Sequence, residues 1–203
     1  DHDGSLLLID TGGWLSWGCP TSKLAKPQIL GAIYRIRRKG GAATRDPLGK
    51  KIDWQKSSAE ELAGLLADKR PRIRDRARET LVLRGAGAGK ALASFLGKNK
   101  DPAARARAVW ALSRTGGETA LAALRTALRD QHAGVCQAAA RSLGELKDKA
   151  AVEALCRIVI SGTPGVRRTA AEALGKIGEP EAVPAILDSI TSSPDDYLDH
   201  ALC

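Results

Sequence analysis

A 31-residue repeat is the feature that most constrains how this chain folds. From residue 58 onward, residues of the same kind recur at steps of 31. One column of the repeat contains Ala77, Ala108, Ala139 and Ala170. A second column contains Leu81, Leu112, Leu143 and Leu174. Several independent columns at one fixed period predict an array of similar units, in which each unit buries its apolar face against its neighbours.

Each unit contains two helical patterns. Residues 118–130 typify the first and residues 164–178 the second, because in both of them apolar residues lie three or four positions apart. The expected helix starts agree with this division. Ser58 and Glu61 have the spacing of a capping box, and Asp101 precedes a first-turn proline. We therefore predict a mainly α protein with about five pairs of helices.

The composition favours helices over sheets. Hydrophobic residues make up 43% of the 203 residues but aromatic residues only 3%, so alanine and leucine must supply most of the packing. Small side chains suit helices that approach closely, whereas sheet sandwiches usually need β-branched and aromatic residues. No apolar run reaches the roughly 18 residues that a membrane-spanning helix needs, so we expect no membrane insertion.

The beginning of the chain differs from the repeats. The stretch LGAIYRIRRKG, residues 30–40, places Ala32, Tyr34 and Ile36 on one face, which predicts a strand. A second strand is expected from residue 5 to residue 10, so residues 1–40 are predicted to form a short β segment.

Two boundaries follow from this division. Residues 41–57 are polar and contain Gly and Pro, so we predict a linker there and assign the repeats to residues 58–203. The sequence contains no methionine, and a second helix of the fifth unit begins near Asp195 with no room to finish. We therefore expect a piece of a longer polypeptide, with an array that is truncated in its fifth repeat.

The second helix of each unit resembles a known family of repeats. The segments PGVRRTAAEALGKIG, PRIRDRARETLVLRG and PAARARAVWALSRTG are similar to the second helix of a HEAT repeat, whose pattern is P-x-V-R-x-x-A-x-x-A-L-G. The arginine column contains Arg74, Arg105, Cys136 and Arg167, so Cys136 departs from the pattern. The resemblance covers residues 58–203 and implies a HEAT-type α-solenoid. It implies little about function, because such arrays bind many unrelated partners.

The beginning of the chain adds a second resemblance. Together with the array, DHDGSLLLIDTGGW and CPTSKLAKPQILGAIYRIRR resemble the planctomycete-type membrane-bound dehydrogenases, also called haem-binding CxxCH proteins. In that family a β-propeller is followed by HEAT repeats and a c-type cytochrome domain. The resemblance implies that residues 1–40 are the end of an incomplete propeller. It also implies that the parent protein is extracytoplasmic, or periplasmic, and binds haem c elsewhere, whereas no cofactor is expected within this chain.

A basic run offers candidate binding residues. Residues 69–78 contain six cations, but Ile73 and Ala77 occupy core columns and Arg74 is expected to bridge neighbouring repeats. The surplus cations are Arg70, Arg72, Arg76 and Arg78. They would suit an acidic partner or a nucleic acid, although most such runs are solvated helix faces.

Trp110 is a second candidate. Its column contains Glu79, Trp110, Arg141 and Glu172, so a tryptophan stands where the other repeats have charge. Arg107 and Arg114 lie three and four positions away on the same helix face. The cluster would suit a partner contact; alternatively, the N-terminal segment or the linker folds over the ring. No cysteine or histidine pair has metal-ligand spacing, so no metal site is expected.

The expected function is that of a non-catalytic HEAT-repeat scaffold, and we predict that this chain is not itself an enzyme. Its partners would be proteins, namely the propeller and haem domains of its own parent or an acidic partner. Two alternatives remain. One is a nucleic-acid-binding HEAT module that uses the basic middle of the chain. The other is a lyase subunit resembling the HEAT-like phycobilin lyases, which would need a pigment partner.

Overall fold

The computed structural model of the chain describes residues 5–10, 12, 30–40 and 45–192. It divides into two compact units. One unit comprises residues 1–51 together with Arg70–Arg72, and the other comprises Ile52–Lys69 and Ile73–Cys203. The first contains a β-hairpin and the second contains the helical array.

The hairpin confirms the predicted β segment. Strands β1 (Leu6–Asp10) and β2 (Ala32–Ile36) pair antiparallel, with Leu8 opposite Tyr34. Both faces are open to solvent, because Leu8 is 53% exposed on one face and Ile33 is 71% exposed on the other. The segment that contains CPTSKLAKPQ lies outside the described residues.

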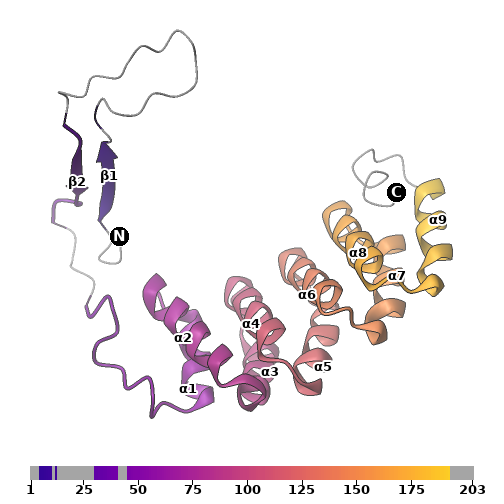
Figure 1. Cartoon of the computed structure of the whole chain (residues 1–203), viewed down its shortest axis with the longest axis horizontal. Helices are drawn as coiled ribbons and strands as arrows, with labels where there is room; N and C mark the ends of the chain where they lie inside the picture. Colours follow the sequence, from indigo (N-terminus) through magenta and orange to yellow (C-terminus); the bar gives the residue numbers. More distant parts are fainter. Residues whose placement is uncertain (1–4, 11, 13–29, 41–44, 193–203) are drawn as a thin grey trace, which may run out of the picture. The chain divides into compact units, whose positions relative to one another are not determined.

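The second unit consists of paired helices, as predicted (Figure 1). The first helices of the pairs are α1 (Ala59–Gly64), α3 (Gly89–Lys98), α5 (Glu118–Ala127), α7 (Val152–Ser161) and α9 (Val183–Ser192). The second helices are α2 (Pro71–Leu83), α4 (Pro102–Thr115), α6 (Ala133–Glu145) and α8 (Pro164–Ile177). Short 3₁₀ turns at Leu65–Ala67, Gly85–Ala88, Lys149–Ala151 and Pro180–Ala182 lie between helices.

The helices form two rows. In the odd-numbered row α1 contacts α3, α3 contacts α5 and α7 contacts α9; in the even-numbered row α4 contacts α6 and α6 contacts α8. This arrangement confirms a mainly α solenoid with a small N-terminal sheet. The second helix of the fifth repeat, expected near Asp195, lies outside the described residues.

The repeat columns form the core of the array. The alanine column (Ala77, Ala108, Ala139, Ala170) and the leucine column (Leu81, Leu112, Leu143, Leu174) are almost completely buried. The helix starts also follow the sequence. Ser58 Oγ accepts the backbone N–H of Glu61 at 3.1 Å, and the Glu61 carboxylate accepts the backbone N–H of Ser58 at 2.7 Å. Both bonds of the predicted capping box are therefore present.

The contact between α6 and α8 depends on a glycine. A Cβ atom added to Gly144 would lie 2.7 Å from the Cα atom and 2.9 Å from the Cβ atom of Ala173. Distances below 3.0 Å are steric clashes, so only glycine fits at this position. The absence of a side chain at Gly144 lets the two helices approach closely.

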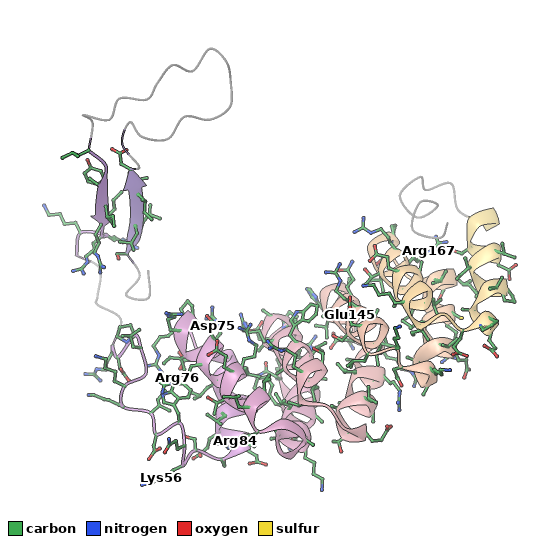
Figure 2. All side chains as sticks on the ribbon, in the orientation of Figure 1. Lys56, Asp75, Arg76, Arg84, Glu145 and Arg167 are labelled. Atoms are coloured by element: carbon green, nitrogen blue, oxygen red, sulfur yellow. The ribbon has the colours of Figure 1, made fainter. Side chains whose placement is uncertain are left out.

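Part of the expected linker packs onto the array. Trp54 is only 8% exposed and belongs to the hydrophobic core. The guanidinium of Arg76 lies 4.7 Å from the centre of the Trp54 ring, and Arg84 donates to the Trp54 carbonyl at 3.3 Å. Both arginines are labelled in Figure 2. The chain from Ile52 onward thus belongs to the array, and Trp54 covers its first repeat.

Candidate functional site

The repeat arginines hold the array together in different ways. Arg105 on α4 binds Asp130 in the turn before α6 through two bonds, from Nε at 2.7 Å and from Nη2 at 2.8 Å. Arg167 on α8, labelled in Figure 2, donates to Ser189 Oγ of α9 at 2.9 Å. These two side chains link neighbouring repeats, as expected of this column.

Arg74 differs from the other repeat arginines. It donates to the carbonyls of Asp68 and Lys69 at 2.9 and 3.1 Å, which belong to its own repeat. The expectation that it bridges neighbouring repeats was therefore wrong. Asn99 holds the position relative to Arg74 that Asp130 holds relative to Arg105. Asn99 carries no charge to attract the guanidinium of Arg74.

Cys136 replaces the arginine at the next junction. Its buried thiol donates to the Asp130 carbonyl at 2.9 Å, and burial raises the pKa of the thiol. The partner has changed as well, because Ser161 occupies the position equivalent to Asp130. The equivalent positions of the third and fourth repeats therefore form no ion pair. A different pair lies near this junction, where Arg125 on α5 binds buried Asp148 in the turn before α7, from Nε at 2.7 Å and from Nη2 at 2.9 Å.

Two equivalent grooves lie at these junctions. The first has a volume of about 680 Å³ and is lined by Arg105, Asp130 and Ala123, among others. The second has a volume of about 410 Å³. Cys136 lines it, together with the apolar side chains Leu128, Ala154, Ile158 and Val166 and the arginines Arg129 and Arg157. Asp130, Ser161 and Thr163 line it too, so the second groove combines apolar side chains with polar and charged groups.

Three of the four surplus arginines make contacts within the chain. Arg70 donates to the Asp46 carbonyl at 3.0 Å, Arg76 covers Trp54, and Arg78 lies 3.8 Å from Asp75. Arg72 is exposed and makes no hydrogen bond or ion pair within the described part of the chain. Most of these arginines are therefore engaged in contacts within the chain.

The candidate residues around Trp110 also differ in whether they make contacts within the chain. Arg107 donates to the Leu66 carbonyl at 3.0 Å, so it supports the first two repeats. Trp110 is 41% exposed, and Arg114 is exposed without a hydrogen bond or ion pair among the described residues. Arg141 on α6 lies at the position equivalent to Trp110 and is also exposed. We did not predict Arg141 as a site residue, although its repeat column contained the signal.

No metal centre is formed by the described residues, since none of their His, Cys, Asp and Glu side chains gather in groups of three or more that could hold an ion. Among the same residues, no helix is both long enough and apolar enough to cross a membrane.

The two rows of paired helices define an α-solenoid, a class of repeat protein. A model of the HEAT repeats matches residues 59–142 and 126–203. The chain therefore belongs to the HEAT-repeat family. A comparison with curated protein sequences gives no match.

Several solved structures are similar to this chain. The complex of CpcE and CpcF of phycocyanin lyase from Nostoc sp. PCC7120 is 26% identical, with a TM-score of 0.56, over 72% of this chain and 63% of that one. Human deoxyhypusine hydroxylase is 24% identical, with a TM-score of 0.51, over 71% of this chain and 59% of that one. The Escherichia coli protein YIBA is 21% identical, with a TM-score of 0.54, over 83% of this chain and 63% of that one.

The comparisons correct one expectation. We predicted that this chain is not an enzyme, but the similarity to phycocyanin lyase overturns that prediction because a related array forms part of an enzyme there. The likeness to deoxyhypusine hydroxylase concerns the fold alone. The chain spans about three fifths of the length of these proteins, at 63% and 59%. The lyase structure is a complex, which agrees with the expectation of protein partners.

Proposed function

We propose that this chain is the HEAT-repeat part of a lyase-type enzyme that works in complex with a second protein. The observation that carries the proposal is the 26% identity to the CpcE–CpcF complex of phycocyanin lyase over 72% of this chain. Stacked helix pairs provide an extended surface on which a second chain can bind. The proposed substrate class is a pigment-bearing protein of the phycocyanin kind.

The groove beside Cys136 supports this proposal. Its volume of about 410 Å³ lies within the range of small-molecule sites, roughly 300–1,000 Å³. Ile158 and Val166 provide apolar surface, and Arg129 provides positive charge, whereas Arg157 is paired with Glu153. An apolar molecule with carboxylates, such as a pigment, would suit this combination.

The test uses the purified chain, CpcF as the second protein, and phycocyanin from Nostoc sp. PCC7120. We expect the chain and CpcF to elute together in size-exclusion chromatography, and we expect the visible absorbance of the pigment to change when both are incubated with phycocyanin. Ala154→Trp, which fills the groove beside Cys136, should abolish the absorbance change. Ala123→Trp fills the equivalent groove one repeat earlier and should leave it unaffected. Separate elution and an unchanged spectrum with the wild-type chain would contradict the proposal.

The hairpin favours a second proposal, about the parent protein. Leu6, Ile9 and Ile33 are 63%, 66% and 71% exposed, and an isolated two-stranded hairpin is at best marginally stable in water. These strands would be covered if they were the end of a propeller, as in the extracytoplasmic dehydrogenases with a haem c domain. Expression of the complete gene product with haem staining tests this proposal. A gene product without a propeller or a CxxCH segment would refute it.

A further inference from the structure

Most arginines of the even-numbered row are occupied by contacts within the chain. Arg76 and Arg107 bind Trp54 and the Leu66 carbonyl, respectively. Arg114 on α4 and Arg141 on α6 differ, because neither makes a hydrogen bond or ion pair within the described part of the chain. The acid nearest to Arg141 along its helix, Glu145, is paired with Lys176 and attracts Arg141 without forming an ion pair with it. Two neighbouring helices thus each present one arginine to solvent.

Trp110 lies beside these two arginines. It is 41% exposed, and its indole N–H has no hydrogen-bond partner among the described residues. Arg114 lies one turn after Trp110 on the same helix, and Arg141 holds the position equivalent to Trp110 on α6. An exposed tryptophan near arginines is typical of the centre of a protein interface.

The three side chains can be reached by a single partner segment. Arg114 follows Trp110 by one helical turn on α4, and Arg141 lies at the equivalent position on α6. Because α4 packs against α6, their axes lie about 10 Å apart. A segment that crosses both helices would therefore contact the ring and both guanidinium groups.

We propose that Trp110, Arg114 and Arg141, which we call the α4–α6 patch, bind an acidic segment of a partner protein. An apolar side chain of that segment would pack on the Trp110 ring. Carboxylates on either side of it would bind Arg114 and Arg141, with the planar guanidinium groups favouring paired hydrogen bonds. This inference stands apart from the lyase assignment, because it concerns only the surface that a partner would contact.

The charge distribution favours a protein over a nucleic acid. Affinity for nucleic acid grows with the number of phosphates that are neutralised, and among the described residues near Trp110 only Arg114 and Arg141 are cations without a hydrogen bond or ion pair. The basic run on α2 adds little, since Arg76 and Arg78 are engaged within the chain. Asp75 and Glu79 further place negative charge on α2.

The test measures binding of the full chain to a short fluorescent peptide with glutamates around a central leucine. The same peptide with glutamine in place of glutamate and a short duplex DNA serve as comparison probes. We expect the acidic peptide to bind at low salt, the glutamine peptide to fail, and Trp110→Ala to weaken binding about tenfold. The double variant Arg114→Gln/Arg141→Gln should lose about tenfold as well.

Lys90→Gln is the matched control, since Lys90 is an exposed cation on α3 in the odd-numbered row. Its affinity should equal that of the wild-type chain, and circular dichroism verifies that all variants fold. An equal loss in Lys90→Gln, equal binding of the glutamine peptide, or no binding by the wild-type chain would overturn the proposal. Tight binding of the duplex that survives Trp110→Ala, with none of the peptide, would point to nucleic acid and overturn it too.

Discussion

Two successive junctions of the array use the same positions in different ways. Between the second and third repeats, Arg105 and Asp130 form a doubly hydrogen-bonded ion pair, with side chains only 16% and 11% exposed. Between the third and fourth repeats, Cys136 and Ser161 occupy these positions, and α6 and α8 approach closely through Gly144. At these equivalent positions one junction has an ion pair and the other has none, although the second junction has a different pair, between Arg125 of α5 and Asp148 in the turn before α7, at 2.7 Å.

The difference shows that the repeat period does not determine how neighbouring units are held together. Loss of the arginine at Cys136 is accompanied by loss of the carboxylate at Ser161, so no unpaired charge is left buried at the junction. The exposed pair of Glu145 and Lys176 adds little there, because solvent screens it. Cys136 and Ser161, which cannot form the ion pair, both line the proposed ligand groove.

The largest effect is expected from filling the space beside Ala173. Gly144→Val should destabilise the chain by about 3 kcal/mol, because its side chain would overlap the backbone of α8. Gly175 is the matched control, since it occupies the same column one repeat later with no atom within 4 Å of an added Cβ. Gly175→Ala should be neutral or stabilise by up to about 1 kcal/mol in urea unfolding. Equal losses in both variants would show that close packing does not distinguish this junction.

Removal of the ion pair should have the next largest effect. Arg105→Ala leaves Asp130 without its partner, and we expect a loss of about 2 kcal/mol in the free energy of unfolding. Arg114→Ala removes an equal charge from the exposed surface of the same helix and should change stability by less than about 0.5 kcal/mol. If the two variants unfold at the same urea concentration, the pair does not stabilise the junction.

The ion pair can also be rebuilt at the other junction. Cys136→Arg alone should destabilise, because it places a charge opposite Ser161, which cannot neutralise it. The double variant Cys136→Arg/Ser161→Asp should recover about 1 kcal/mol relative to the sum of the two single changes. Additive effects in this double-mutant cycle would show that the two junctions differ in more than these two residues.

The smallest effect concerns pH. Burial raises the pKa of Asp130, but the hydrogen bonds from Arg105 and from the His132 backbone outweigh it and hold this pKa below its ordinary value. The pair therefore stabilises the fold above about pH 4, the unfolded value, and this contribution is lost as the pH falls through the lowered pKa. The difference in Tm between wild type and Arg105→Ala should shrink between pH 7 and pH 3. A constant difference would contradict this account.

The fold could be predicted largely because the core repeats. The period placed Ala139 and Leu143 in a buried column, and both are fully buried. The start of the first helix followed from local chemistry, since Ser58 and Glu61 needed no distant partner. The resemblance of the array to HEAT repeats also predicted an α-solenoid, and the HEAT-repeat match confirms the family.

The contacts of the arginines could not be predicted in this way. Arg76 covers Trp54. Trp54 lies before the repeats, so no equivalent residue in another repeat indicated where it would pack. Arg107 binds a backbone carbonyl at Leu66, and every residue has such a group. Trp110 had two open interpretations, a contact for a partner and a ring covered by the N-terminal segment, and both stay predictions.

Trp54 has a consequence for how such an array can grow. New repeats arise when a unit is duplicated, and each duplicate needs an apolar face on which to stack. Trp54 already occupies such a face at the first repeat, held there by Arg76 and Arg84. A unit inserted ahead of Ala59 would have to displace this tryptophan, whereas one inserted between later repeats would meet surfaces of its own kind. Trp54 therefore favours the insertion of new repeats between later units over their insertion ahead of the first one.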